Sequence, residues 1–199
     1  FGNLTRKIHR NTSWDEARFE SCGQKWMDMS EGHYGVSLLN DCKYGHSALD
    51  GVMTLTLIKS GIEPNPTADQ EEHTFTYALY PHAEGWRQAN TVQEAMKLNQ
   101  PLLSEDGGHA GCQNSFVWVD KSNVIIETVK MAEDDDGIIV RLYESENAKT
   151  KAHIFFGEKI SSVESCNCLE EIKQTIETDG EGFEITVKPY EIQTYRVRF

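Results

Sequence analysis

The chain has 199 residues, of which 38% are hydrophobic and 26% charged, so it is long enough for one large domain or two small ones with buried cores. Acidic residues outnumber basic ones by 32 to 19, and the net charge of -13 disfavours nucleic acids and anionic membrane surfaces as partners. The longest apolar stretches, such as 137–140, are far shorter than the roughly 20 residues that a membrane-spanning helix needs.

Two strands are predicted in the first half from the alternation of apolar and polar residues. Segments 52–58 and 73–80 both have an apolar residue at every second position, which gives each strand one face for burial. In the second segment, this face carries Tyr77 and Leu79. Pro81 lacks a backbone N–H and is predicted to end that strand.

One helix is predicted after these strands. Thr91 and Glu94 have the spacing of a capping box, and an apolar stripe at helical spacing follows. Asn99 and Pro101 are predicted to end the helix.

The glycine-rich loop 104–111 separates two strand-dense regions, and a domain boundary is predicted shortly after it. The predicted domains are 1–115, the end of a large β-sandwich, and 116–199, a small C-terminal β-sandwich. Strands in the second are predicted at 116–119, 124–129, 138–143, 152–156, 183–187 and 190–199. The fold class is therefore all-β with one short helix.

No metal site is predicted in this chain. Five cysteines make an odd number, which favours reduced thiols. Cys166 and Cys168 have no second pair to complete a zinc site, so a strand with the thiols on opposite sides is the favoured interpretation. The acidic run 134–136 suits calcium by charge, but it lies between two strands, and a hairpin turn is favoured.

No catalytic residue is predicted either. The serines and cysteines show no nucleophile motif. A glycosidase needs two carboxylates, and the 32 acidic residues offer too many pairs to choose among. Asp41, Asp69, Glu71 and Glu72 lie in loops beside strands, but solvated surface charge is the default interpretation for them.

Specific strings extend this interpretation. Together they closely resemble the C-terminal region of cytosolic-type α-mannosidases of glycoside hydrolase family 38. They lie at 11–15, 17–20, 38–45, 66–70, 75–82, 126–130, 139–144 and 189–192. The resemblance extends over essentially the whole chain.

The resemblance implies a retaining, zinc-dependent enzyme that hydrolyses terminal α-mannosides. It implies an N-terminal α/β barrel, a helical bundle and then β-sandwiches, of which the large one resembles the galactose-mutarotase supersandwich. In that family, the zinc and the attacking aspartate belong to the barrel, so none of the residues here inherits those roles. The chain starts with Phe1 and is expected to be cut from a longer protein.

The implied partners are an α-mannoside, bound through the complete enzyme, and the missing N-terminal catalytic domain. The implied location is cytoplasmic, and a homo-oligomer is left open. The fragment alone is expected to be inactive.

Two loops are candidates for bordering the sugar pocket. They are 40–45 and 68–73, and the two alternative roles for them are contact with the sugar and bracing of the barrel. Related sequences tend to have glycine where this chain has Glu71, so the path of the second loop is in question. The candidate substrate-binding residues are Asn40, Asp41, Lys43, Asp69, Gln70 and His73.

A second hypothesis is a self-sufficient, non-catalytic carbohydrate-binding β-sandwich. Four tryptophans and seven tyrosines could stack on sugar rings in such a module. Binding of mannosides by the isolated chain separates it from the first hypothesis. A third hypothesis, a non-enzymatic interaction domain, requires that no mannosidase barrel precede Phe1.

Overall fold

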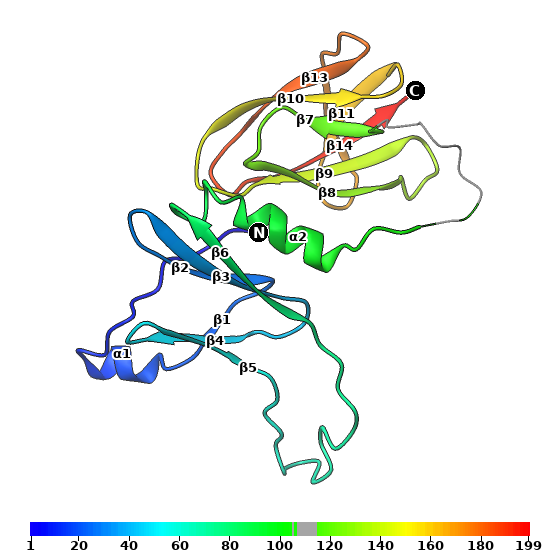
Figure 1. Ribbon diagram of the computed structural model, residues 1–199. Coiled ribbons are helices and arrows are strands. Elements are labelled where there is room, and N and C mark those ends of the chain that lie inside the picture. The colour runs from blue at the N-terminus through cyan, green and yellow to red at the C-terminus, as the bar shows by residue number, and fades with distance from the viewer. Residues whose placement is uncertain (105, 107–114) are drawn as a thin grey trace. The chain divides into compact units, whose positions relative to one another are not determined.

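The computed structural model describes residues 1–104, 106 and 115–199 (Figure 1). The chain forms two compact units, one of residues 5–104 and the other of residues 1–4 with 105–199. Strands dominate the described residues, with only two short helices, so the predicted all-β fold is confirmed. The glycine-rich loop 104–111 falls almost entirely outside the described residues, and the domain limits 1–115 and 116–199 stay a prediction.

The unit of residues 5–104 contains two three-stranded antiparallel sheets, with the orders β2-β3-β6 and β1-β4-β5. Helix α2 packs against β2 and β3. The elements are α1 (Ser13–Ala17), β1 (Ser21–Cys22), β2 (Trp26–Ser30), β3 (Tyr34–Asn40), β4 (Gly45–Leu49), β5 (Val52–Thr56), β6 (Tyr77–Ala83) and α2 (Thr91–Asn99).

Strand β6 runs through the proline that was expected to end it. It begins at Tyr77 and continues to Ala83, with Pro81 opposite Val36 of β3. Because β6 lies at the edge of its sheet, the missing N–H of Pro81 need not interrupt a ladder between two neighbours. The predicted strand end is therefore wrong, and the reason is the position of the strand in the sheet.

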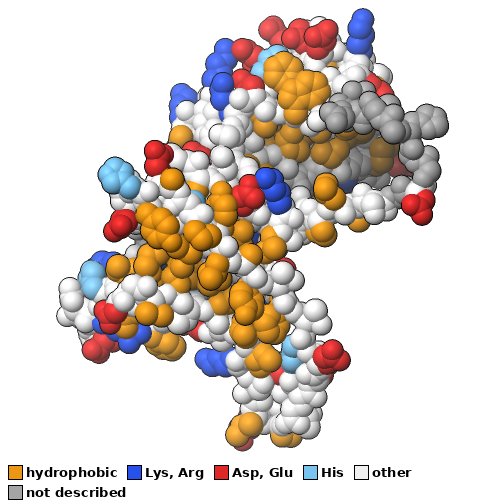
Figure 2. Space-filling model, in the orientation of Figure 1, with side chains coloured by type: hydrophobic (Ala, Val, Ile, Leu, Met, Phe, Trp, Pro, Cys, Tyr) orange, Lys and Arg blue, Asp and Glu red, His pale blue; other side chains and the backbone are white. Residues whose placement is uncertain are grey.

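One face of the β2-β3-β6 sheet is only partly covered, because Leu38 on it is buried but other apolar side chains on it are open to solvent. Tyr34, Tyr77 and Leu79 lie on this face and are 52%, 56% and 67% exposed. We call these three residues the open sheet face. Figure 2 shows hydrophobic side chains gathered over this sheet. The alternation placed Tyr77 and Leu79 on one face correctly, but the expectation that this face is buried is wrong for this chain.

The opposite face of the sheet is covered by α2 and contains the buried His82. The unit has few buried hydrophobic residues. Among the described residues of 5–104, they are Leu38, Leu39, Val92 and Ala95. A core of this size is small for a unit of about 100 residues.

The two helices begin differently from the prediction. Thr91 is the first residue of α2, and the N-cap is Asn90, in the left-handed conformation with no side-chain capping bond. The predicted capping box is therefore wrong, whereas the end at Asn99 is confirmed. A capping box does occur in α1, which was not predicted, where Thr12 and Asp15 bond to each other's backbone. Neither helix is long and apolar enough to cross a membrane, judged over the described residues.

The second unit is a sandwich of two antiparallel sheets, with the orders β13-β10-β7 and β12-β11-β14-β9-β8. Strand β12 was not predicted, and of β11 only the end at Cys166 was, as part of the strand expected through Cys166 and Cys168. The elements are β7 (Val117–Val119), β8 (Val124–Met131), β9 (Ile138–Glu144), β10 (Thr150–Phe156), β11 (Ser162–Cys166), β12 (Ile172–Ile176), β13 (Gly182–Val187) and β14 (Ile192–Arg198).

Both sheets of this unit contribute to one continuous core. Leu142, Ile154, Val163, Val187 and Val197 are each 0% exposed within it. Their neighbours along each strand lie on the opposite face of the sheet, as period-two alternation requires. The sandwich predicted for the C-terminal half is thus present as a well-buried structure.

The first four residues of the chain belong to this second unit. Asn3 donates its amide to the carbonyl of Ser145 at 2.9 Å and accepts from the Tyr190 hydroxyl at 2.8 Å. The rings of Phe1 and Tyr143 lie 4.8 Å apart. The second unit is therefore built from both ends of the chain.

Candidate functional site

Asn40 shapes the first candidate loop from within. It is the last residue of β3 and is 1% exposed. Its side-chain oxygen accepts from the Lys43 N–H at 2.7 Å, and its amide lies 3.2 Å from Nε2 of His46. The Tyr44 carbonyl lies 3.1 Å from Nδ1 of His46 and can only accept, so Nδ1 carries the proton and Nε2 accepts from Asn40. Asn40 is thus a loop-shaping residue.

Burial lowers the pKa of His46, although the Tyr44 carbonyl and Glu20 act in the opposite direction. The neutral ring fits the hydrogen bonds just described, since one nitrogen donates and the other accepts. His46, which was not among the predicted residues, holds the 40–45 loop in shape through its hydrogen bonds to Asn40 and Tyr44.

Asp41 and Lys43 both reach the segment that leads into β6. A carboxylate oxygen of Asp41 accepts from the Thr76 N–H at 2.9 Å, and the Lys43 ammonium lies 4.7 Å from the centre of the Phe75 ring. Hydrogen bonds from Cys42 and from Thr76 lower the pKa of Asp41. These two predicted residues therefore hold the 40–45 loop against residues 75–76.

The second candidate loop is exposed and folded on itself. Nε2 of His73 donates to the Asp69 carbonyl at 2.9 Å, and the Gln70 amide donates to the Pro66 carbonyl at 3.2 Å. Asp69 adopts the left-handed conformation with φ 57, whereas Glu71 does not have a positive φ. Glu71 therefore adopts a backbone conformation that does not require glycine in this structure.

The Asp69 carboxylate is a free group of this loop, as are the carboxylates of Glu71 and Glu72 among the described residues. Within the described residues, it makes no hydrogen bond or ion pair, and the residue is exposed. The structure does not join the two loops by any hydrogen bond or ion pair between Asn40, Asp41 or Lys43 and the second set, as far as the described residues show. Asp41 and Lys43 instead contact Thr76 and Phe75, which follow the second loop along the chain.

The structure contains a buried polar cluster whose residues were not predicted as site residues. It consists of Asp28, Ser37, His82 and Thr91, from β2, β3, β6 and α2. Asp28 Oδ2 lies 2.7 Å from both the Ser37 hydroxyl and Nε2 of His82, and the Thr91 hydroxyl lies 2.8 Å from Ser37. Ser37 and Asp28 meet the same ring nitrogen, so the histidine cannot relay a proton between them as in a catalytic triad. The cluster fastens α2 to the sheet.

A sequence signal for this cluster exists in Gly35, which lies opposite His82. A Cβ at this position would overlap the imidazole ring. Nothing in the local sequence, however, shows that the glycine faces a histidine 47 positions away.

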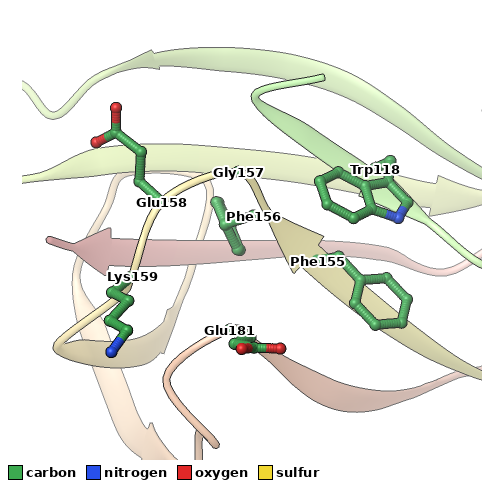
Figure 3. Close-up of a pocket in the computed structure, with 7 residues that line it drawn as sticks. All are labelled: Trp118, Phe155, Phe156, Gly157, Glu158, Lys159 and Glu181. Atoms are coloured by element: carbon green, nitrogen blue, oxygen red, sulfur yellow. The ribbon is translucent and has the colours of Figure 1, made fainter. Parts of the chain in front are cut away.

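A shallow hollow of about 180 Å³ lies on the second unit. Figure 3 shows the rings of Trp118 and Phe155 on one side of it, with Glu158 and Lys159 across from them and Glu181 between. Trp118 and Phe155 are cross-strand neighbours on β7 and β10. No candidate residue from the sequence falls in this hollow.

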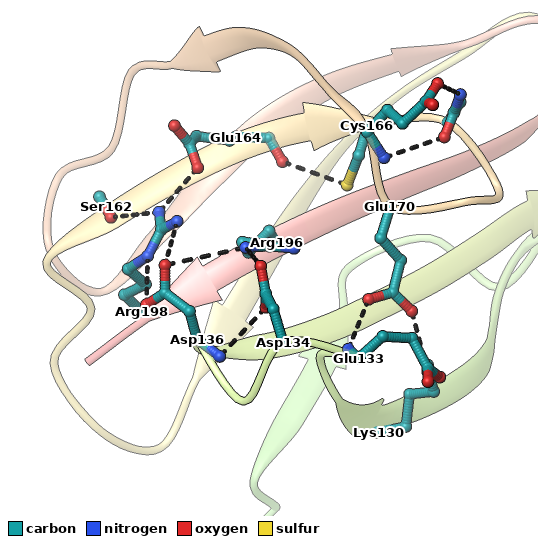
Figure 4. Close-up of polar contacts among 12 residues, drawn as sticks. Lys130, Glu133, Asp134, Asp136, Ser162, Glu164, Cys166, Glu170, Arg196 and Arg198 are labelled. Atoms are coloured by element: carbon teal, nitrogen blue, oxygen red, sulfur yellow. Dashed lines mark hydrogen bonds and ion pairs between the residues drawn. The ribbon is translucent and has the colours of Figure 1, made fainter.

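The acidic run 134–136 forms a turn between β8 and β9, as favoured from the sequence. Figure 4 shows the carboxylates of Asp134 and Asp136 engaged by two arginines of β14. Arg196 donates to Asp134 at 2.7 Å, and Arg198 makes two bonds with Asp136, at 2.8 and 2.9 Å. The arginine bonds lower the pKa of Asp134 and of Asp136. These acids are therefore paired within the protein.

The cysteines that the structure describes do not form a metal site. Cys166 ends β11 and is buried, whereas Cys168 lies in the following turn and is exposed, so the predicted strand through both is wrong at Cys168. The described cysteines are all free thiols, and Cys112 lies outside the described residues. No group of three or more His, Cys, Asp or Glu side chains in the described part of the chain could hold a metal ion.

Comparison with known proteins gives two matches to family models. Residues 1–67 match the glycosyl hydrolases family 38 C-terminal domain, and residues 123–195 match the glycosyl hydrolases family 38 C-terminal beta sandwich domain. Both models describe C-terminal parts of one enzyme family.

Individual relatives agree. The chain is 38% identical to Alpha-mannosidase G of Dictyostelium discoideum over 98% of the chain and 19% of that protein. It is 38% identical to human Alpha-mannosidase 2C1 over 85% of the chain and 17% of that protein. The chain thus spans about a fifth of the length of these curated relatives.

A solved structure supports the fold. A crystal structure of an alpha-mannosidase from Enterococcus faecalis V583 matches 98% of the chain with a TM-score of 0.77 and 20% identity, and the match covers 23% of that chain. This likeness concerns the fold alone, whereas the two family models and the sequence relatives show that the chain belongs to the C-terminal region of glycosyl hydrolase family 38.

Proposed function

We propose that this chain is the C-terminal, non-catalytic part of a retaining, zinc-dependent α-mannosidase that hydrolyses terminal α-mannosides. The observation that carries this proposal is the alignment of almost the whole chain with proteins named alpha-mannosidase, of which it covers about a fifth. The remaining four fifths of such a protein would hold the catalytic domain.

The zinc and the reacting carboxylates are assigned to that other part. The described residues do not fit a zinc ion, because no group of three ligating side chains exists among them. A retaining glycosidase also needs two carboxyl groups about 5–5.5 Å apart across the scissile bond. The acidic turn 134–136 does not offer such a pair, because its carboxylates are bonded to arginines.

The small core and exposed apolar residues of the unit 5–104 support the proposal that this unit packs against another domain. It has only four buried hydrophobic residues in its described part, and the open sheet face exposes Tyr34, Tyr77 and Leu79. Soluble proteins rarely leave contiguous apolar surface uncovered without a partner. We therefore assign the open sheet face to contact with the preceding domains of the same enzyme.

The candidate substrate-binding residues divide into two groups by their existing bonds. Asn40, Asp41 and Lys43 already have partners inside the unit, so their role is to hold a loop in place. Asp69 has a free carboxylate on an exposed loop whose shape is fixed by the Asp69–His73 bond. Because the bond from His73 holds the Asp69 backbone in place, Asp69, rather than the equally free Glu71 or Glu72, is our candidate for accepting a hydrogen bond from a sugar hydroxyl, with Gln70 and His73 beside it.

The proposed location is cytoplasmic, which fits the free thiols of Cys22, Cys42, Cys166 and Cys168. Assembly of the complete enzyme into a homo-oligomer is compatible with this proposal.

The test compares the complete enzyme with this chain on a chromogenic aryl α-mannoside. The complete enzyme should cleave it with retention and lose activity on zinc removal, and the chain alone should be inactive. Cleavage by the purified chain, or a complete enzyme that ignores α-mannosides, would overturn the proposal.

The role of Asp69 is tested by Asp69→Ala in the complete enzyme. Loss of a hydrogen bond to a charged group is worth roughly 1.5–3 kcal/mol, so kcat/KM should fall about 10- to 100-fold. Glu72→Ala, in the same exposed loop, is the matched control and should leave kcat/KM unchanged. Equal kinetics for both variants would remove Asp69 from the site.

A further inference from the structure

We infer that the solvent face of the β13-β10-β7 sheet carries a binding site for one pyranose unit of a neutral oligosaccharide. Trp118 and Phe155 stack against the sugar ring, and Glu158, Lys159 and Glu181 bond to its hydroxyls. This inference does not depend on the proposed mannosidase activity, because it concerns binding to residues of this chain alone.

The aromatic pair is the first reason. The rings of Trp118 and Phe155 are nearly parallel, at 11°, with their centres 5.5 Å apart, and Trp118 is 42% exposed. Figure 3 shows both rings turned toward the viewer, with neither covering the other. A pyranose presents a flat face of C–H groups, which packs well against the face of an aromatic ring.

These rings are not needed for the core. Ile154 and Phe156, on either side of Phe155 in β10, point inward and are 0% and 5% exposed, and Val117 and Val119, on either side of Trp118 in β7, pack against the core, so Trp118 and Phe155 lie on the opposite face. Large aromatic side chains on the outer face of a sheet are an informative exception to the usual alternation. The half-buried Phe155 and the exposed Trp118 therefore form an aromatic surface on the outer face that a ligand can reach.

The platform is held in position by its neighbours. The ring of His153 lies 4.2 Å from that of Phe155, at 30°. His153 in turn packs over Gly182, where an added Cβ would lie 2.6 Å from Nε2 and would overlap the Ile154 carbonyl oxygen. A preformed surface loses less conformational entropy when it binds a ligand.

The charged rim is the second reason. Glu158 and Lys159 follow β10, and Glu181 precedes β13, so two loops supply the groups that surround the hollow. Within the described residues, none of these three side chains has a hydrogen bond or ion pair. Sugar hydroxyls both donate and accept, so they match carboxylates and an ammonium placed together.

Size and charge narrow the ligand class. A hollow of about 180 Å³ is smaller than the usual pocket for a drug-sized molecule and suits a single ring. Nucleic-acid bases also stack on aromatic rings, but their phosphates would meet Glu158, Glu181 and a net charge of -13. The same carboxylates disfavour acidic sugars, which leaves neutral glycans.

The experiment titrates the 199-residue chain with methyl α-mannopyranoside, a mannotriose and a cellotriose, and follows tryptophan fluorescence and saturation-transfer NMR. We expect saturable binding of at least one of these sugars, with a Kd on the order of 1 mM. Trp118→Ala should weaken binding at least 10-fold, and Glu181→Gln should weaken it several-fold. Trp14→Ala, which removes another exposed tryptophan, is the matched control and should bind as the unchanged chain does.

Folding of each variant is checked by circular dichroism and thermal melting, and Glu181→Gln keeps the test valid if Trp118→Ala unfolds. The inference would be overturned if none of the three sugars bound saturably. It would also be overturned if Trp118→Ala and Glu181→Gln both bound as tightly as the unchanged chain. It would also be overturned if Trp118→Ala left sugar binding unchanged but disrupted association with the rest of the enzyme, which would make the platform a protein interface. Failure here leaves mannoside cleavage by the complete enzyme intact, so the two proposals are tested separately.

Discussion

His46 shows how one buried side chain makes a loop dependent on pH. Its ring accepts from Asn40 and donates to the Tyr44 carbonyl, and burial lowers its pKa. Protonation would turn the accepting nitrogen into a donor that faces the amide donor of Asn40. The shape of the 40–45 loop therefore requires the neutral ring.

This predicts a specific loss of stability in acid. A folded-state pKa below the ordinary value of 6.5 means that the unfolded chain takes up the proton first, so stability is complete above about pH 6.5 and falls as the pH decreases. His46→Gln, which cannot titrate, should make the urea midpoint less dependent on pH between 7.5 and 5.5. His33→Gln, at an exposed position, should keep the original dependence.

An unchanged pH dependence in His46→Gln would contradict this role.

The partners of His46 could not be read from the sequence, although His46 lies only six residues from Asn40. The sequence resemblance singled out the 40–45 loop for sugar contact or for bracing the barrel, and the structure adds that Asn40, Asp41 and Lys43 contact His46, Thr76 and Phe75. Such pairings depend on how strands are placed in space, which local patterns do not specify.

At the scale of elements, the pairing of β10 with β13 depends on a glycine. Gly182 lies opposite Phe155, and the His153 ring packs against it. A side chain here would collide with backbone, which cannot rotate away as a side chain can.

Gly182→Ala should therefore destabilise the second unit by about 1–3 kcal/mol, the usual range for forcing extra atoms into a packed site. The measurement is urea unfolding followed by tryptophan fluorescence. Gly32→Ala is the control, since nothing lies within 4 Å of a Cβ at that position. A Gly182→Ala variant as stable as the Gly32→Ala variant would show that β10 and β13 separate easily at this point.

Alternation predicted strands well where one face is buried and the other exposed. The strands β8, β9, β10, β13 and β14 were predicted for this reason, and their inward residues form the core. Strand β12 was missed because four of its five residues are exposed and carry no apolar period. Strand β6 was misjudged at Pro81, because a proline is tolerated only at a sheet edge and the sequence does not show which strands are edges.

At the scale of the whole molecule, the two units differ in how completely they bury their apolar residues. The second has a large shared core, whereas the first has four buried hydrophobic residues in its described part and leaves the open sheet face uncovered. An exposed apolar sheet face tends to associate with other copies when its natural cover is absent.

The isolated chain should therefore self-associate through the open sheet face. Leu79→Asp should increase the monomer fraction measured by size-exclusion chromatography with light scattering, because a charge at this position opposes apolar association. In the complete enzyme, the same substitution should instead lower the thermal stability. Leu169→Asp is the control, since Leu169 is 80% exposed and lies in a turn of the other unit. An equal monomer fraction in both variants would contradict the role of this face.

The bonds of Asn3 to Ser145 and Tyr190 have a consequence for how the protein could be divided. The backbone leaves the second unit after residue 4 and returns to it after residue 104, so that unit is discontinuous in sequence. A piece that starts at residue 116 would lack this N-terminal strip and expose the groups that Asn3 satisfies. Conversely, protease cleavage between residues 105 and 115 would leave residues 1–4, which belong to the second unit, covalently attached to the first product.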